Sequence, residues 1–375
     1  MEKGNKVFHK LDRIVGIPVV FILGLFKKKR KNLPTNILKI AILNLGSIGD
    51  NVLMSGPMAD LRSKYPDAYI CVFTGDTNYQ MVKLIPQLNE VVKLPITKPI
   101  KCVKLFKRYG CFDIVFDFGP WPRINAIYSF FIKGSIKVGF KSLKQYRHYV
   151  YDIPIHHRHD LHEIDNHRNL ISPIYSDAFH HNLVMNFNAS EKVNQLIEQS
   201  GKYCIIHCWS GGLRSDLKQW NNMRWAELVS HISGYFDSIL LTGAPSDIEK
   251  TAELFSVITP FNLKCKILNI AGEFNLAETA YLLKQSNYII CVDTGISHMA
   301  AAFNKRMICL QGPANSLRWR PYSDESIVIN PEKGEYGYLN FGYENSKTDD
   351  NSMDNISVET VFNTFKEKSG LQLLA

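Results

Sequence analysis

The stretch YIICVDTGISHMAAA, residues 288–302, decides the fold class of this chain. Its first five residues form an apolar run typical of a buried strand, and the run ends at Asp293. Gly295 opens the next turn, and small residues then favour a helix. Free N–H groups at the start of such a helix can hold a diphosphate. The pattern predicts an anion-binding turn of an α/β fold. Asp293 as a plain N-cap and His298 as a packed core residue remain alternatives.

Apolar runs of the same kind recur along the sequence in both directions. They lie at residues 37–45, 69–73, 114–118, 136–140, 203–207, 238–241, 267–271 and 307–310. Helix-like segments separate them, and the pattern falters between residues 146 and 182. The sequence therefore predicts two doubly wound, Rossmann-like domains, residues 36–185 and 186–343. Residues 344–375 are expected to form an exposed loop and a last helix.

The net charge of +9 is concentrated in the first 35 residues, which hold nine Lys or Arg against Glu2 and Asp12. Because only +2 is left for the remainder, the charge does not indicate a nucleic-acid partner. Residues 14–26 are apolar and run into the basic residues 27–31, and this stretch is too short to span a bilayer. Pro18 is expected to kink it. We expect residues 1–35 to associate with a membrane, with residues 14–31 on anionic lipid. A packing helix with solvated charges is the alternative.

The eight cysteines are scattered singly, without a CxxC pair, and most lie inside apolar runs. A disulfide framework or a zinc site would cluster them. We therefore expect buried thiols in a reducing compartment, the cytoplasm.

A second glycine-containing turn, NLGSIGD, spans residues 44–50. Gly46, Ser47 and Gly49 would let the backbone approach a bound group closely. The spacing is GxxG rather than GxGxxG, and no acidic residue ends the next strand, so an oxidoreductase is not favoured. On spacing alone, Asp50 is interpreted as a residue that caps the helix.

Two more turns in the second half carry polar groups. In HCWSGGLRSDLKQW, residues 207–220, Ser210 and Gly211 are typical of an anion cradle, and Arg214 and Lys218 could reach its phosphate or remain solvated. In LTGAPSD, residues 241–247, Asp247 either holds ribose hydroxyls or caps a helix, capping being the default.

Together and in this order, the motifs resemble glycosyltransferase family 9, the family of ADP-heptose:lipopolysaccharide heptosyltransferases. The resemblance runs from about residue 37 to the final helix. It is carried by GSIGDNVLMSGPMADLRSKYPDA, FDIVFDFG, KQWNNMRWAELV, LTGAPSD, DTGISHMAAAF and GPANSLRWRPY. It implies the GT-B fold, two Rossmann-like domains facing a cleft, with the acceptor held by the first domain and the nucleotide-sugar by the second. It also implies inversion of the anomeric centre and no metal or other cofactor.

The resemblance assigns roles to single residues. Asp50 matches the catalytic base of the family, and Gly46, Ser47 and Gly49 then belong to the acceptor-side loop. Lys218 matches a lysine that meets the donor phosphates, and Asp247 an acid near the donor ribose. The complete donor-side set is Lys218, Ser210, Gly211, Arg214, Asp247, Asp293, Thr294, Gly295 and His298.

The function that follows is transfer of heptose from ADP-heptose to a lipopolysaccharide core or related lipid-linked saccharide. The enzyme would be peripheral on the inner face of the bacterial inner membrane. The loop from Ser210 to Lys218 is longer than is usual in the family, which leaves donor identity open, and Ser352 precedes Met353 where many members carry a cysteine. A GT-B epimerase acting on a free nucleotide-sugar and a non-catalytic scaffold are the rival hypotheses.

Eight of the 12 histidines lie between residues 148 and 181. Their spacing fits no familiar zinc motif, so a basic surface that faces an anionic acceptor is favoured over a metal site.

Overall fold

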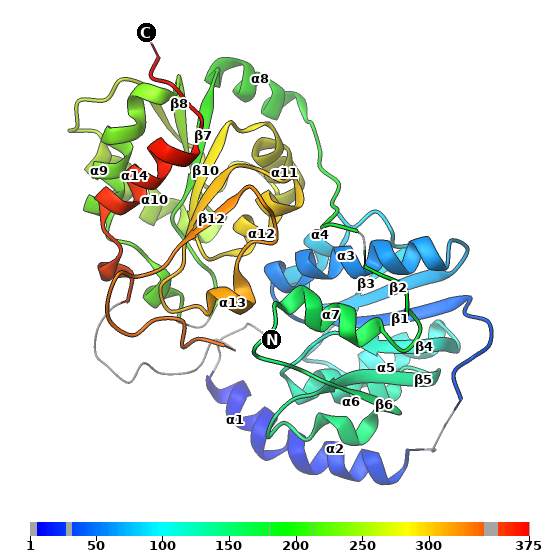
Figure 1. Cartoon of the computed structure of the whole chain (residues 1–375). Coiled ribbons are helices and arrows are strands. Elements are labelled where there is room, and N and C mark those ends of the chain that lie inside the picture. Colours follow the sequence, from blue (N-terminus) through cyan, green and yellow to red (C-terminus); the bar gives the residue numbers. More distant parts are fainter. Residues whose placement is uncertain (1–5, 28–31, 180, 213, 341–351, 375) are drawn as a thin grey trace. The chain divides into compact units, whose positions relative to one another are not determined.

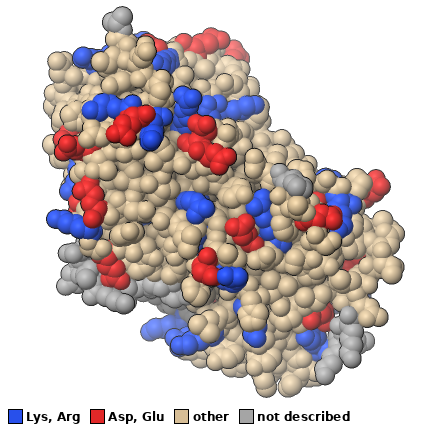
Figure 2. Space-filling model, in the orientation of Figure 1, with Lys and Arg blue, Asp and Glu red and all other residues tan. Residues whose placement is uncertain are grey.

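The computed structural model describes residues 6–27, 32–179, 181–212, 214–340 and 352–374. The chain forms two compact units, residues 1–185 and 186–375, which are described separately (Figure 1). Of the predicted basic run, residues 28–31 lie outside the described residues. On the face drawn in Figure 2, acidic and basic side chains are interspersed over both units.

The first unit is built on a six-stranded parallel sheet with the order β3-β2-β1-β4-β5-β6. Its strands are β1 (Lys39–Asn44), β2 (Tyr69–Thr74), β3 (Glu90–Lys93), β4 (Phe112–Asp117), β5 (Gly134–Lys141) and β6 (Ile153–His156). Its helices from β1 onward are α3 (Ile48–Lys64), α4 (Asp76–Val82), α5 (Pro99–Arg108), α6 (Arg123–Phe131), the short 3-10 helix η1 (Arg147–Val150) and α7 (Glu163–Ile171). Helices on both faces leave the central strands buried, which is why β1 and β2 read as almost unbroken apolar runs.

The second unit repeats this plan, with the order β12-β11-β10-β7-β8-β9. Its strands are β7 (Tyr203–His207), β8 (Ser238–Thr242), β9 (Lys266–Asn269), β10 (Tyr288–Val292), β11 (Met307–Leu310) and β12 (Ser326–Ile329). Its α-helices are α8 (Glu191–Ser200), α9 (Asn222–Ile232), α10 (Ile248–Ile258), α11 (Leu276–Gln285), α12 (Gly295–Ala302), α13 (Ser316–Trp319) and α14 (Val358–Lys368). Its 3-10 helices are η2 (Ser215–Lys218), η3 (Ser233–Tyr235), η4 (Pro245–Asp247) and η5 (Ser352–Asn355). The final helix packs on this core through Val361 and Phe365.

Counted along the chain, both sheets have the strand order 3-2-1-4-5-6 of the Rossmann fold. The order reverses between β1 and β4 in the first unit and between β7 and β10 in the second. Ligands of open α/β sheets bind at the carboxyl ends of the strands beside such a reversal. The predicted fold class, α/β with two doubly wound domains, is confirmed.

Two helices, α1 (Lys6–Ile14) and α2 (Gly16–Leu25), precede the first strand. The helix is interrupted between them at Val15, one turn before Pro18, which lies in the first turn of α2. An interruption there is what the missing N–H and the ring of Pro18 are expected to cause. Helix α2 packs on α6 and η1 through the fully buried Val20. No helix among the described residues has both the length and the apolar character needed to cross a membrane.

Candidate active site

In the first unit, the turn between β1 and α3 holds Asp50 in a capping box. Asp50 Oδ2 accepts hydrogen bonds from the Ser47 backbone N–H at 2.5 Å and from Ser47 Oγ at 2.7 Å. In return, Ser47 Oγ accepts from the Asp50 N–H at 3.5 Å. The carboxylate is therefore fixed at the positive end of the α3 dipole. The capping role proposed from spacing is present, and it uses one of the two carboxylate oxygens.

Glycine is required at position 46 by this arrangement. A Cβ there would stand 2.7 Å from Asp50 Oδ2 and 2.9 Å from Asn44 Oδ1. The Gly46 N–H also donates to Asn44 Oδ1, and Asn78 Nδ2 donates to the Gly46 carbonyl. The turn is thus held from both sides, and Gly49 and Asp50 are buried.

A buried ion pair supports the neighbouring strand end. Asp117, the last residue of β4, pairs with Arg147 of η1 at 2.6 Å, and both side chains are completely buried. Tyr151 donates to the same Asp117 oxygen at 2.6 Å, and the Gly119 N–H donates to the other. This network fixes the loop after β4 beside the Asp50 turn, because β1 and β4 are adjacent strands. Sequence reasoning did not identify it.

In the second unit, Lys218 and Asp293 meet at the carboxyl edge of the sheet. Lys218 Nζ lies 2.5 Å from Asp293 Oδ2, although the residues are 75 positions apart. Burial is the largest single influence and would raise the pKa of Asp293, but Lys218, His298 and Gln311 together outweigh it and the pKa is lowered. Asp293 is thus an anion that holds a cation in place, and it is not the N-cap of the alternative interpretation, because the N-cap of the next helix is Thr294.

Helix α12 begins directly after this pair. Its N-cap residue, Thr294, makes no side-chain hydrogen bond to the first turn. The helix starts at Gly295 with its amide groups directed toward the carboxyl edge, where an anion is favoured. His298 is 3% exposed on this helix and belongs electrostatically to the same group, because it helps to lower the pKa of Asp293.

The ends of β7 and β8 supply a neutral polar pair. His207 Nδ1 and Thr242 Oγ1 lie 2.9 Å apart, and burial lowers the pKa of His207 to about 4 despite the opposing influence of Asp247. Next to them, Trp209 Nε1 donates to Thr251 Oγ1 of α10 at 2.8 Å. His207 is therefore neutral near pH 7, and its contact with Thr242 supports the strand end that leads to the loop from Ser210 to Lys218.

The structure gives Asp247 the capping role that was its default interpretation. Its Oδ2 accepts from the Ala244 N–H at 3.0 Å, and the side chain is partly exposed at the end of β8. Gly211, by contrast, is exposed, and a Cβ added there would meet nothing within 4 Å. Ser210 is partly buried, and Arg214 adopts a left-handed backbone conformation at the start of η2.

The sequence analysis did not identify Gln311 at this edge, and it assigned no site role to Ser352 and Met353. Gln311, fully buried after β11, donates from Nε2 to the Trp319 carbonyl at 3.0 Å and helps to lower the pKa of Asp293. Ser352 and Met353 of η5 pack so closely on Gly312 that a Cβ there would stand 2.6 Å from Met353 Sδ. Helix η5 also contacts η2, which carries Lys218. A polar residue at the end of a buried strand was the available signal for Gln311.

The histidine-rich segment, residues 148–181, is more buried than predicted. His162 and His167 are buried and the side chain of His157 is 1% exposed, with His157 Nε2 3.1 Å from both oxygens of the buried Glu163. His181 pairs with Asp60 at 2.6 Å. Several of these histidines therefore pack inside the first unit, so they cannot all face an acceptor. Over the described residues, no group of three or more His, Cys, Asp or Glu is arranged to hold a metal ion.

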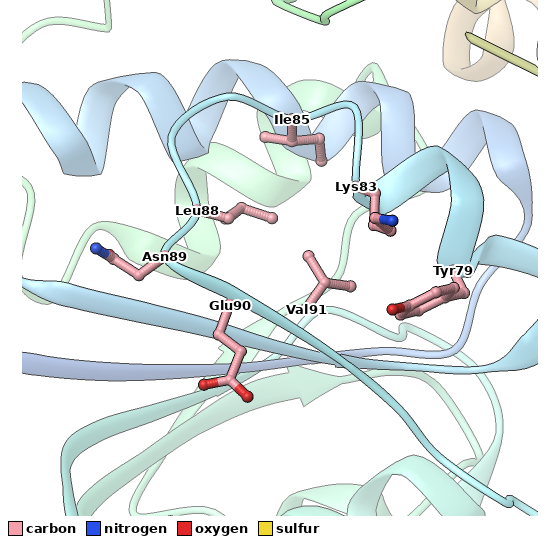
Figure 3. A pocket seen from close by; sticks show the side chains of 7 residues that line it. All are labelled: Tyr79, Lys83, Ile85, Leu88, Asn89, Glu90 and Val91. Atoms are coloured by element: carbon pink, nitrogen blue, oxygen red, sulfur yellow. The ribbon is translucent and has the colours of Figure 1, made fainter.

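A shallow pocket beside the edge strand β3 lies apart from these turns. Figure 3 shows Tyr79, Lys83 and Glu90 around its mouth, with Ile85, Leu88 and Val91 at its wall. None of the predicted site residues lines it.

The strand-end turns can be compared with known proteins. A model of glycosyltransferase family 9 (heptosyltransferase) matches residues 112–346. Lipooligosaccharide heptosyltransferase 2 of Haemophilus influenzae is 29% identical over 135 residues, 36% of this chain and 39% of that enzyme. Lipopolysaccharide heptosyltransferase 2 of Escherichia coli K12 is 22% identical over 313 residues, 78% of this chain and 88% of that enzyme.

Solved structures agree on the fold. The ADP-heptose lipopolysaccharide heptosyltransferase II of E. coli superimposes with a TM-score of 0.68 at 19% identity, over 88% of this chain and 98% of that one. A glycosyltransferase family 9 structure from Veillonella parvula gives 0.74 at 17% identity, over 90% and 99%. The predicted GT-B fold is thus confirmed. Because the family model spans more than half of the sequence, this chain belongs to glycosyltransferase family 9, the heptosyltransferase family, and is a glycosyltransferase.

Proposed function

We propose that the protein transfers heptose from ADP-heptose to a lipopolysaccharide core or a related lipid-linked saccharide, with inversion and without a metal. The named relatives from H. influenzae and E. coli support heptose and this class of acceptor. The proposed sites are the Asp50 turn for the acceptor and the Lys218, Asp293 and α12 turn for the donor.

One observation carries the donor assignment: an ammonium group is held beside a helix N-terminus at the point where the strand order reverses. A diphosphate bound to the amides of Thr294 and Gly295 would place its oxygens near Lys218. Lys218 and Arg214 then stabilise the negative charge that develops as the diphosphate leaves. Ser210 and the exposed Gly211 would let the backbone approach the donor closely, Asp247 would contact the ribose beside its capping bond, and His298 would support the turn.

Asp50 is proposed as the base. A carboxylate has about four lone-pair sites, so Asp50 can keep its capping bonds and still accept a proton. The acceptor hydroxyl oxygen bonds to the anomeric carbon as the bond from that carbon to the diphosphate breaks. Its proton passes to Asp50, and ADP leaves with the electron pair. Gly46, Ser47 and Gly49 let the acceptor approach the Asp50 carboxylate.

The acceptor class implies work at a membrane. We propose that the enzyme is peripheral at the cytoplasmic face of the inner membrane and is held there through residues 14–31. The apolar helix α2 and the basic residues that follow it support this proposal.

The test is transfer by purified protein to a truncated lipopolysaccharide acceptor in detergent. A panel of nucleotide-sugars is offered in excess EDTA, and the mass of the acceptor is measured. We expect a gain of one heptose with ADP-heptose. Gain of another sugar would reassign the donor, and loss of activity in EDTA that Mg²⁺ restores would refute metal independence. Donor conversion without any acceptor would replace transfer by epimerisation.

A further inference from the structure

Helix α2 is apolar on two faces, and the described protein covers only one. Val20 is fully buried against Ala126, Val150 and Tyr151. The opposite face exposes side chains at helical spacing, namely Pro18, Phe21, Ile22 and Leu25. A helix that is apolar all round is normally buried on all sides or lies in lipid.

The exposed apolar face continues beyond α2 at both ends. Ile14, at the end of α1, is 69% exposed, and Leu11 and Val15 are also exposed. At the other end, Leu25 is 71% and Phe26 74% exposed. Single exposed apolar residues are ordinary on protein surfaces, but a contiguous set marks an interaction surface.

The loop after β5, residues 142–149 with the first residues of η1 included, extends the same face. The ring of Phe21 meets that of Tyr149 edge-on, with centroids 5.5 Å apart. Nearby, the Arg123 guanidinium binds Asp12 of α1 at 2.9 Å and also the backbone carbonyls of Lys144 and Gln145. Arg123 therefore joins α1 to the loop through hydrogen bonds. Helix α6, which carries Arg123, packs on the sheet through β4.

The loop carries its own amphipathic side chains. Leu143 is 84% exposed, and Tyr146 and Tyr149 are also exposed. Exposed Lys144 adds positive charge here, as Lys10 and Arg13 do on α1. Residues 6–27 contain one acid, Asp12, and it is neutralised by Arg123. Figure 2 shows basic side chains at the edge of the first unit where Figure 1 draws α1.

We propose that α1, α2 and the loop 142–149 form one membrane-binding surface, the helix–loop face, which inserts its apolar residues into an anionic bilayer. Aromatic and aliphatic groups with a basic fringe fit the interface of such a bilayer. A second copy of the chain fits less well, because pairing would bring like charges together.

This surface has a consequence for the reaction, and only this step rests on the proposed function. The loop 142–149 leaves the carboxyl end of β5, which lies two strands from β1. Strands in a sheet are about 4.8 Å apart, so the loop starts roughly 10 Å across the sheet from the Asp50 turn. The loop therefore brings the membrane to the edge of the sheet where a lipid-linked acceptor must enter.

The experiment measures sedimentation of the full chain with vesicles of phosphatidylcholine and phosphatidylglycerol, without donor or acceptor. We expect wild-type protein to bind anionic vesicles, and less so at high salt. Leu25→Ser and Leu143→Ser should each weaken the partition coefficient about fivefold, because each removes an apolar side chain from the bilayer. The matched control is Ile100→Ser on α5, 74% exposed but outside the helix–loop face.

Three results would overturn the inference: no binding of wild-type protein, Leu143→Ser binding as tightly as wild type, or a dimer in solution that the same variants dissociate. Transfer to detergent-dispersed acceptor separates this test from that of the proposed function. Active protein that does not bind vesicles refutes the membrane surface, together with the proposed attachment through residues 14–31, and leaves the transfer reaction standing. Inactive protein that binds vesicles refutes the transfer reaction alone.

Discussion

The first strands of the two units end alike, but the helices at the two candidate sites begin differently. Strand β1 ends at Asn44, whose carbonyl accepts from Thr74 Oγ1 of β2, and β7 ends at His207 beside Thr242 of β8. In the first unit, the next helix, α3, is closed by the Ser47–Asp50 capping box. In the second, α12 follows the neighbouring strand β10, and its N-cap Thr294 makes no capping bond.

The presence or absence of a capping side chain decides what each helix N-terminus can bind. A helix N-terminus whose amides are bound by its own side chains has little left for a ligand anion. Its carboxylate can instead accept a proton from a neutral hydroxyl. A helix without such a cap, with Lys218 beside it, suits a diphosphate. The comparison therefore supports the proposed placement of the acceptor hydroxyl at the first unit and of the donor diphosphate at the second.

The largest expected effect is on turnover in Asp50→Asn. Asparagine has nearly the same shape and can keep the cap, but it cannot take a proton. A general base contributes about 10² to 10⁴ in rate, so we expect kcat to fall about a thousandfold while ADP affinity, measured by calorimetry, stays unchanged.

The control for this change is Asp76→Asn, which alters the first-turn acid of α4 in the same unit. It should leave kcat as in wild type. If Asp50→Asn instead lowers stability and keeps kcat, Asp50 is only a cap.

The next effect concerns pH. His207 ends the first strand of the second unit and can bind a proton, whereas Asn44, at the same position in the first unit, cannot. Burial lowers the pKa of His207 to about 4, and the unfolded value is near 6.5. The unfolded chain thus binds a proton that the folded chain refuses between these values. Its contribution to stability is complete above pH 6.5 and is lost as the pH falls toward 4, by about 3 kcal/mol in total.

We expect His207→Gln to remove this dependence, since glutamine stays neutral and can bond Thr242. Urea unfolding of both proteins at pH 7.5 and 4.5 measures it. An equal loss of stability on acidification in both would exclude His207 as its source.

The sequence predicted the central strands and the glycine-containing turns, because buried runs and strand-to-helix glycines are local signals. It missed the edge strands β3, β6 and β12. Each has only four residues and is half-exposed or alternating, so its identity depends on the neighbour it pairs with.

The candidate site divides in the same way. The resemblance to the family brought out both Asp50 and Lys218, and the capping role of Asp50 followed from helix chemistry. The contact between Lys218 and Asp293 joins residues 75 positions apart, and the Asp117–Arg147 pair joins residues 30 apart. Pairings of that kind are set by strand order and cannot be inferred from one sequence.

Lys218→Ala should weaken ADP binding about thirtyfold, because one charge-assisted contact to phosphate is lost. It also leaves Asp293 buried without its ammonium partner, so stability should fall as well. The double change Lys218→Ala with Asp293→Asn should restore stability but not affinity. Lys366→Ala, an exposed lysine of α14, is the control. Affinity that returns with stability would mean that Lys218 only shapes the turn.

The smallest effect compares the two N-caps directly. Ser47→Ala should lower the free energy of unfolding by about 1 kcal/mol, the usual cost of losing a capping side chain. Thr294→Ala should change it very little, since Thr294 caps nothing. Urea unfolding of the two variants at pH 7.5 measures the difference. The same unfolding measurement with ADP tests the donor site. ADP bound at α12 should stabilise both variants equally if its contacts are to the backbone amides. Equal losses without ADP would mean that α12 is closed as α3 is, and the donor site would then have to lie elsewhere.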